Sequence, residues 1–247
     1  MQPDYRRDLF DAYHIRTSQL DADDPAKQEW FRIYSQSYYV PHLSDVDRAT
    51  AEVLEVGCNK GFLLASLRDA GFRRLRGVDL SAGDVEVARR NVPEAEIGCE
   101  DAFGYLDSRP GQFDVIIMKA VLEHVLKDRV LTLIERVAGA LKPDGTVVID
   151  VPNMDWLFAG HERYMDFTHE VGFTKESLTQ IVGMVFPRVE VFPADNDLRP
   201  GAGLRPRLAR LRIGTARTVV RTLLRWANPE GGENPIWARS LIAVAKK

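Results

Sequence analysis

Val53-Leu-Glu-Val-Gly-Cys-Asn-Lys-Gly-Phe-Leu-Leu64 is the stretch that decides the fold. Its apolar residues predict a strand that runs into a turn at Gly57 and Gly61 and then into a helix. Glycine is needed where the backbone turns tightly and a ligand must lie against it without a Cβ in the way. The dinucleotide fingerprint Gly-x-Gly-x-x-Gly is not matched, because Asn59 holds the position of its middle glycine.

An acidic residue, Asp79, follows Gly57 of this turn by 22 residues. Asp79 stands in Gly77-Val-Asp-Leu-Ser81, where a second strand is predicted to end. A carboxylate at that place can accept both ribose hydroxyls of a nucleoside that lies across the strand ends. Since the glycine turn offers no diphosphate cradle, the combination favours S-adenosylmethionine over NAD.

At these residues the chain resembles the class I S-adenosylmethionine-dependent methyltransferases. The resemblance covers roughly residues 50–192 and the last strand. It rests on motifs in the family order: the Glu55-x-Gly-x-x-x-Gly61 turn, Asp79, Asp101-Ala102 and Leu141-Lys-Pro-Asp-Gly145. It implies a Rossmann-like α/β fold whose seven-stranded sheet is mostly parallel with an antiparallel last strand. It also implies that S-adenosyl-L-methionine is the methyl donor and S-adenosyl-L-homocysteine the product.

Composition sets the broad class. The chain has 247 residues, of which 45% are hydrophobic, enough for one α/β core. The formal charge of −3 argues against a nucleic-acid binder. Two cysteines cannot form a disulfide framework, and we expect both to be reduced. No apolar run approaches the roughly 20 residues of a membrane span, and the charged stretch 4–8 is unlike a signal peptide, so we expect a cytoplasmic protein.

Strand and helix patterns alternate after residue 50, which predicts a parallel sheet. The predicted strands are 52–56, 74–79, 95–98, 113–118, 146–151, 188–192 and 238–245. The predicted helices are 4–14, 25–38, 60–70, 82–91, 102–107, 128–141 and one that begins at Thr174. We expect four parts: an N-terminal helical cap or lid at 1–50, the cofactor-binding core at 51–194, a basic helical insertion at 195–236 and a final core strand at 237–247.

The resemblance also assigns the cofactor residues. It places the turn residues around the methionine part, Asp79 and Leu80 at the ribose and adenine, and Asp101 with Ala102 at the adenine amino group. Asp101 could instead be only the N-cap of the helix 102–107. The expected set is Glu55, Gly57, Cys58, Asn59, Gly61, Asp79, Leu80, Asp101, Ala102 and Lys119.

Methyl transfer to a hydroxyl needs a group that positions the oxygen and removes its proton. Histidine titrates near neutrality and is the default choice. Of the five histidines, three fall on loops predicted at the carboxyl edge of the sheet. We expect His124 to be the general base, with His169 and then His161 as the next candidates, and Glu123 as a further member of the catalytic set.

A metal site is the alternative at the same place. Related enzymes with a Glu-x-x-Glu-His segment use it with a downstream histidine to hold a divalent metal. Glu123 and His124 match that segment, but Ala120 stands where the first glutamate belongs. A site made of Glu123, His124 and either His161 or His169 stays open. We favour no metal, with Glu123 orienting a loop.

The N-terminal segment is rich in aromatic residues. In the family, N-terminal helices commonly lie over the cofactor and help to form the acceptor pocket. His14, Arg16, Tyr34 and Tyr38 are therefore lid candidates. Ordinary packing of these side chains on the core is the alternative.

Residues 199–226 are strongly basic. They contain eight arginines and no acid, and apolar residues recur there at helical spacing. Such a helix can lie on an anionic membrane surface, at the inner face of the membrane, or receive an anionic substrate. It could also pack on this protein's own core or in a homodimer, with its arginines solvated.

The acceptor is inferred from a second resemblance. The segment from Asp166 to Leu178 looks like that of bacterial methyltransferases placed among surface-polysaccharide and glycolipid genes. It implies polysaccharide biosynthesis by O-methylation of a sugar hydroxyl on a glycan or lipid-linked sugar. Two alternatives stay open: a small phenolic or quinone-like acceptor, and a non-catalytic scaffold at a membrane-bound synthase. No nucleic-acid partner is expected.

Overall fold

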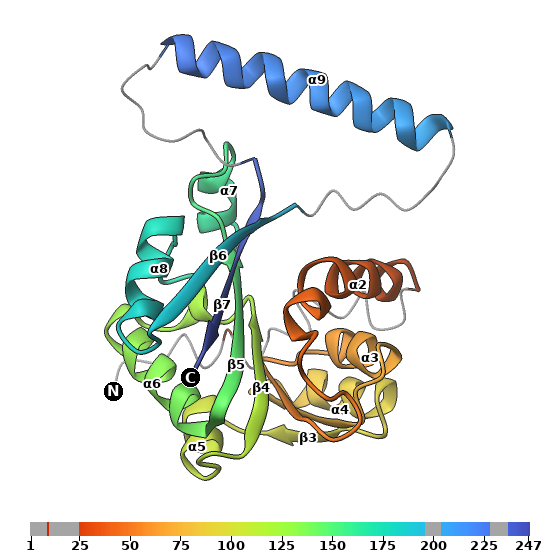
Figure 1. The fold of residues 1–247 in the computed structure, drawn as a ribbon, viewed down its shortest axis with the longest axis vertical. Helices are drawn as coiled ribbons and strands as arrows, with labels where there is room; N and C mark the ends of the chain where they lie inside the picture. Colours follow the sequence, from red (N-terminus) through yellow and green to blue (C-terminus); the bar gives the residue numbers. More distant parts are fainter. Residues whose placement is uncertain (1–8, 10–24, 196–203, 228–236) are drawn as a thin grey trace.

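A computed structural model describes Leu9 and residues 25–195, 204–227 and 237–247 (Figure 1). The predicted helix 4–14 lies outside these residues except for Leu9, and so do His14, Arg16 and Arg199. The centre of the molecule is a seven-stranded sheet with the order β3-β2-β1-β4-β5-β7-β6. Its strands are β1 Glu52–Val56, β2 Arg74–Asp79, β3 Glu96–Cys99, β4 Phe113–Lys119, β5 Leu141–Pro152, β6 Arg188–Ala194 and β7 Ser240–Lys246.

The pairing confirms the predicted fold class. The pairs among β1 to β5 are parallel, whereas β7 runs antiparallel to both β5 and β6. The central strand β4 alternates its side chains between two hydrophobic clusters: Ile116 and Met118 belong to one, Val115 and Ile117 to the other. Because β4 is covered on both faces, it reads as a continuous apolar run.

Helices cover both faces of the sheet (Figure 1). One cluster joins the sheet to α5 Ala102–Asp107, α6 Val130–Ala140 and α8 Lys175–Gly183. The other joins it to α2 Pro25–Tyr38, α3 Phe62–Asp69 and α4 Ala82–Asn91. The two layers leave the carboxyl ends of the strands as the exposed edge, where loops can carry a site.

Apart from shifts of one or two residues at the ends of several elements, two features differ from the prediction. β5 begins at Leu141 rather than at residue 146, because Leu141 already pairs with Phe113 of β4. The register shifts before Thr146, and Asp144 takes a φ of +63°, so the predicted turn survives as an irregularity within the strand. A short helix, α7 Ala159–Tyr164, lies in a segment where only a loop was predicted.

The N-terminal segment is tied to the sheet through Asp150, at the end of β5. The hydroxyls of Tyr34 and Tyr39 both donate to Asp150 Oδ2, and Lys119 Nζ lies 3.0 Å from the same oxygen. Tyr34 and Tyr39 are fully buried. Tyr34, one of the lid candidates, therefore packs on the core, which was the alternative to a lid role. The hydroxyl of Tyr38 binds the backbone of Asp195 beyond β6.

Helix α9, Leu204–Ala227, stands beside the open end of the β6–β7 hairpin, away from the sheet (Figure 1). An ion pair between Arg217 and Asp195 connects it to the end of β6. Most of its described side chains are exposed. Among the residues that the structure describes, no helix combines the length and apolar character needed to cross a membrane.

Candidate functional site

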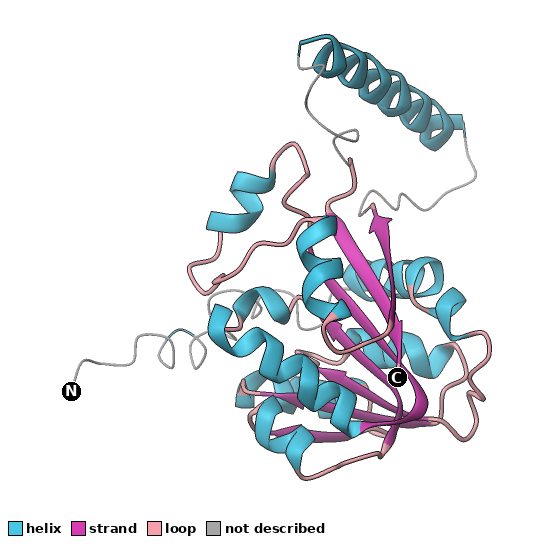
Figure 2. Cartoon of the chain, turned by 60° about the vertical axis from the view of Figure 1, so that its left-hand side comes forward, coloured by secondary structure: helices cyan, strands magenta, loops and turns pink. Residues whose placement is uncertain are grey.

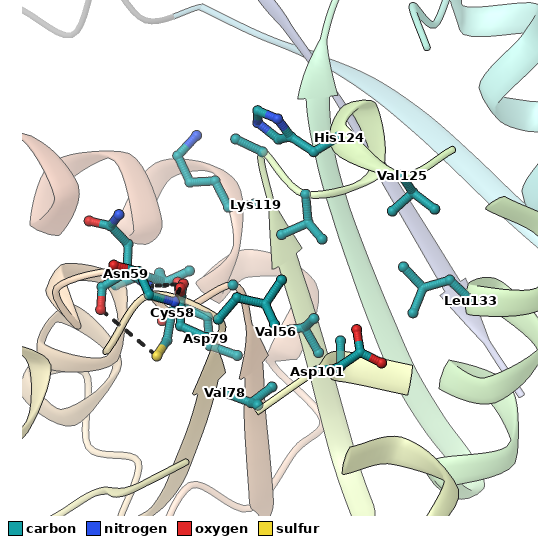
Figure 3. A pocket seen from close by; sticks show the side chains of 18 of the residues that line it. Val56, Cys58, Asn59, Val78, Asp79, Asp101, Lys119, His124, Val125 and Leu133 are labelled. Atoms are coloured by element: carbon teal, nitrogen blue, oxygen red, sulfur yellow. Dashed lines mark hydrogen bonds between the residues drawn. The ribbon is translucent and has the colours of Figure 1, made fainter. Parts of the chain in front are cut away.

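A cavity of about 640 Å³ opens at the carboxyl ends of β1, β2 and β4. Figure 3 shows Asp79 and Asp101 on one side of it and Lys119 and His124 on another. Nine of the ten residues expected at the cofactor line this cavity: Glu55, Gly57, Cys58, Asn59, Asp79, Leu80, Asp101, Ala102 and Lys119. The tertiary structure thus gathers residues from four separate loops around one space.

The glycine turn needs both of its glycines, for different reasons. Gly57 has a φ of +71°, and a Cβ there would come within 2.4 Å of Val121 Cγ2. Gly61 has a φ of +76° and precedes α3; its added Cβ would press on Ala88 of α4 at 3.3 Å. Gly57 therefore keeps the cavity open. Gly61 lies outside the cavity lining, and its lack of a side chain allows the start of α3 to pack closely against α4.

Asp79 is held in a fixed orientation by the backbone. Asn59 N donates to one carboxylate oxygen at 2.8 Å, and Ser81 N donates to the other at 2.9 Å. Burial raises the pKa of Asp79, and these hydrogen bonds offset part of that effect. The next residue, Leu80, is 51% exposed at the cavity, an apolar surface beside an oriented acid. This pair suits a ribose with an attached aromatic base.

Asp101 is the N-cap that was considered as the alternative role, and its position leaves the predicted adenine contact open. Its carboxylate is the N-cap of α5 and accepts a hydrogen bond from Phe103 N at 3.2 Å. It also lines the cavity together with Ala102. The cap leaves the second carboxylate oxygen available to a ligand, so the two roles are compatible.

Glu55 is a buried carboxyl group that faces the cavity. Within the described part of the chain, its Oε2 has no hydrogen-bond partner. Burial raises its pKa well above the usual range. A buried acceptor without a donor calls for a cationic or N–H-bearing ligand. A ligand with an amino group and a sulfonium centre fits this end of the cavity.

The predicted base, His124, lies in the 3₁₀ turn Leu122–His124 after β4 and lines the cavity. Its Nδ1 is 2.8 Å from Thr168 Oγ1, and Thr168 Oγ1 donates to Asp166 Oδ1 at 2.7 Å. Because the threonine proton points to the carboxylate, Nδ1 of His124 must be the donor to Thr168. Nε2 of His124 therefore carries the lone pair, as a base requires.

The hydrogen bonds and charges around Asp166 favour its ionised form. Burial alone would raise the pKa of Asp166, but two hydrogen bonds from Thr168 and the nearby imidazoles of His124 and His169 outweigh it and lower the pKa. A carboxylate thus stands behind the imidazole of His124, one hydroxyl away.

His169 lies next to His124, with ring centroids 4.7 Å apart. Its Nδ1 is 2.8 Å from the carbonyl oxygen of Glu162 and must donate to it, so Nε2 is the lone-pair nitrogen of the neutral imidazole. His161, by contrast, is exposed on α7. The structure brings together two of the three predicted histidines.

Glu123 completes a group that could hold a metal ion. One ligand atom from each of Glu123, His124 and His169 lies within 4.8 Å of the others. Glu123 is 2% exposed, and burial raises its pKa to about 8. Neither of its carboxylate oxygens has a hydrogen-bond partner within the described ranges. The set matches one version of the predicted metal alternative, with His169 rather than His161.

Several residues of the site escaped the sequence analysis. Val121, Val125 and Leu126 form an apolar wall beside His124, and Phe31 of α2 lines the same cavity. Apolar residues in a short loop carry no signal of ligand contact. Asp166 and Thr168 could have been found, since an acid two residues before a threonine often forms a local hydrogen-bonded turn.

Comparison with known proteins gives a consistent picture. Residues 29–199 match a family model described as a methyltransferase domain. The chain is 30% identical over 106 residues to a ubiquinone biosynthesis O-methyltransferase of Neisseria meningitidis, which covers 41% of this chain and 44% of that protein. The chain thus spans less than half the length of this relative.

Solved structures share the fold. A SAM-dependent methyltransferase from Archaeoglobus fulgidus superposes with a TM-score of 0.67 at 20% identity, covering 89% of this chain and 94% of the other. A phosphoethanolamine N-methyltransferase of Haemonchus contortus in complex with S-adenosyl-L-methionine gives 0.59 at 17% identity, covering 98% and 60%.

Proposed function

Because the chain belongs to the S-adenosylmethionine-dependent methyltransferase family, we propose that it methylates a hydroxyl oxygen of a small aromatic acceptor, with His124 as the general base. The observation that carries the proposal is the chain from Asp166 through Thr168 to His124. It presents the lone pair of Nε2 at the wall of the same cavity that holds the cofactor residues.

The cavity residues fit the cofactor, which supplies an electrophilic methyl group on a sulfonium when bound. Asp79 would accept hydrogen bonds from the ribose hydroxyls, and Leu80 would pack against the adenine ring. Asp101 and Ala102 would lie at the adenine amino group. Glu55, whose buried Oε2 has no hydrogen-bond partner in the described part of the chain, would bind the amino group of the methionine part. Gly57 leaves the space in which that part lies.

The catalytic work of the chain is positioning and proton removal. With the methyl donor bound, Nε2 of His124 would hold and accept the proton of an acceptor hydroxyl positioned at the cavity wall. The imidazolium that forms keeps its Nδ1–H on Thr168, and the charge of Asp166 stabilises it. The apolar wall of Val121, Val125 and Leu126 excludes water from the reacting oxygen.

Two features favour a phenolic or quinone-like acceptor over a sugar. A phenol has a pKa of about 10, so a single histidine removes its proton more readily than that of an alcohol. The apolar wall beside His124 suits an aromatic ring, whereas sugar hydroxyls would need polar partners there. The name of the Neisseria relative, which refers to ubiquinone biosynthesis, agrees with this choice.

A sugar hydroxyl on a glycan or lipid-linked sugar is the second candidate. It is supported by the segment from Asp166 to Leu178, which resembles that of surface-polysaccharide methyltransferases and contributes Thr168 and His169 to the site. A lipid-linked acceptor of either class would also give α9 a role. The scaffold alternative has no support from the cavity, whose residues fit both cofactor and base.

The test pairs His124→Ala with His161→Ala as matched control. We expect His124→Ala to lower kcat by about 10²- to 10³-fold, while calorimetry gives an unchanged cofactor affinity. His161→Ala should keep full turnover, because that side chain is exposed on α7. Product analysis with a catechol and with a sugar acceptor separates the two acceptor classes. Wild-type turnover by His124→Ala would remove the assignment.

A metal held by Glu123, His124 and His169 is the competing arrangement, since a ligand nitrogen cannot also accept the proton. Turnover in the presence of a chelator distinguishes this metal site from the general-base mechanism. If turnover is unaffected by removing divalent ions, His124 acts as the base; if turnover is lost and Mg²⁺ or Mn²⁺ restores it, the three residues are ligands.

A further inference from the structure

Helix α9 carries an extreme charge. From Leu204 to Ala227 the sequence contains seven arginines and no acidic residue, in a chain whose net charge is −3. Arg212, Arg221 and Arg225 are exposed, whereas Arg217 pairs with Asp195. A concentration of cations on one exposed element calls for an anionic partner.

One face of α9 is apolar and points to solvent. Leu208, Leu211, Val219, Leu223 and Trp226 are all exposed, and Trp226 is 84% exposed. Their successive spacings of three, eight, four and three residues place them around one side of the helix. The half-buried side chains Ile213, Arg217, Val220 and Leu224 lie on the opposite side, which Arg217 joins to Asp195.

The threonine hydroxyls on the outer side are already satisfied. The hydroxyls of Thr215, Thr218 and Thr222 donate to backbone carbonyl oxygens four residues earlier in the helix. Their methyl groups therefore add to the apolar surface, and no hydroxyl needs water. The exposed face can enter a medium of low polarity at little cost.

A second apolar group lies at the same end of the molecule. Leu157, Phe158, Tyr164 and Met165, in and around α7, are exposed. Figures 1 and 2 show α7 on the side of the core that faces α9. The segment runs on to Thr168 and His169, so this surface adjoins the site.

We propose that α9 docks on an anionic membrane surface, lying in the interface with Leu208, Leu211, Val219, Leu223 and Trp226 in the acyl boundary. At 100° per residue Arg212 falls among these apolar side chains, Arg225 at the edge of their arc and Arg221 farther round the helix. Long arginine side chains reach lipid phosphates from such positions, because the apolar stem can lie along the interface while the guanidinium reaches the headgroups. The presence of an apolar face beside the arginines favours a membrane over a nucleic acid as the partner. A nucleic acid would bind the arginines but leave the apolar face exposed to water. Docking at this end brings the cavity toward the lipid.

The experiment is sedimentation of the full-length protein with phosphatidylcholine vesicles that contain or lack phosphatidylglycerol. We expect the wild type to bind the anionic vesicles at least about tenfold more tightly, and salt to weaken that binding. Arg212→Gln with Arg221→Gln and Arg225→Gln should weaken it about a hundredfold. Trp226 fluorescence should shift to the blue on binding, and Trp226→Phe should reduce the shift.

Two matched double variants test whether the exposed apolar face of α9 is the side that contacts the membrane. Leu208→Ser with Leu211→Ser should weaken binding at least about tenfold, whereas Ile213→Ser with Leu224→Ser, which removes equal apolar area from the opposite side, should leave it nearly unchanged. Circular dichroism and cofactor calorimetry confirm that each variant is folded. Absence of vesicle binding, or equal loss in both variants, overturns the proposal. So does a wild-type dimer that the outer-face variant converts to a monomer, since a second copy then occupies that face.

Discussion

His124 shows how one hydrogen bond decides what a side chain can do. A histidine in a cavity could present either ring nitrogen as N–H, and only one tautomer is a base toward the ligand. Thr168 decides between them, because its own proton is engaged by Asp166. In the proposed mechanism the threonine and the aspartate are therefore positioning residues, which act on the reaction through His124.

Thr168→Val tests this role. Valine has nearly the same shape but cannot accept from Nδ1 of His124, so the imidazole loses its orientation and its link to Asp166. We expect kcat to fall by about 10- to 100-fold, with a shift in the pH–rate profile and an unchanged cofactor affinity. Thr168→Ser, which keeps the hydroxyl, should restore most of the rate. A valine variant with the wild-type pH profile would show that the threonine serves only packing.

At the scale of elements, the turn between β1 and α3 is constrained in two ways. Gly57 combines a left-handed backbone with a neighbour, Val121, that would overlap any added Cβ. The backbone conformation and the overlap with Val121 are separate constraints. The left-handed φ costs a non-glycine residue about 1–2 kcal/mol, whereas the overlap can be relieved by shortening Val121.

Gly57→Ala should therefore weaken cofactor binding by at least about tenfold, measured by calorimetry. Adding Val121→Ala should recover part of the affinity but not all of it, because the strained φ is unchanged. Gly139→Ala in α6 is the matched control: its Cβ meets nothing within 4 Å, and it should stabilise the protein by about 0.5–1 kcal/mol. Wild-type affinity of Gly57→Ala would mean that the methionine part binds elsewhere.

At the scale of the whole molecule, α9 is an insertion in a hairpin that is complete without it. β6 and β7 pair over seven residues, up to Ala194 opposite Ser240. The strand ends are therefore adjacent, and a short turn could join them. The ion pair from Arg217 to Asp195 is partly exposed on both sides and adds little stability.

Replacing residues 196–236 by a short glycine-containing linker should leave the core folded. We expect the free energy of unfolding to fall by no more than about 1 kcal/mol and the cofactor affinity to stay as in the full chain, while vesicle binding is lost. Chemical denaturation, calorimetry and sedimentation measure the three quantities. Loss of cofactor binding together with a large loss of stability would show that the insertion is part of the core.

The sequence by itself determined the sheet and the cofactor loops. The spacing of Gly57, Gly61 and Asp79 predicted the turn and the acid, since these features depend on backbone geometry over a few residues. Apolar periodicity predicted the strands because burial on both faces leaves a continuous pattern. The start of β5 was missed, since the pairing of Leu141 with Phe113 is a contact between distant residues.

Only the tertiary structure decided which histidines meet. His124 and Thr168 are 44 residues apart in the chain, and no local pattern places them at 2.8 Å. Two loops from different strands must pack at one edge before Glu123, His124 and His169 come together while His161 points to solvent. The same holds for α9: its composition predicted a basic amphipathic helix, but which of its apolar side chains remain exposed depends on where the rest of the chain lies.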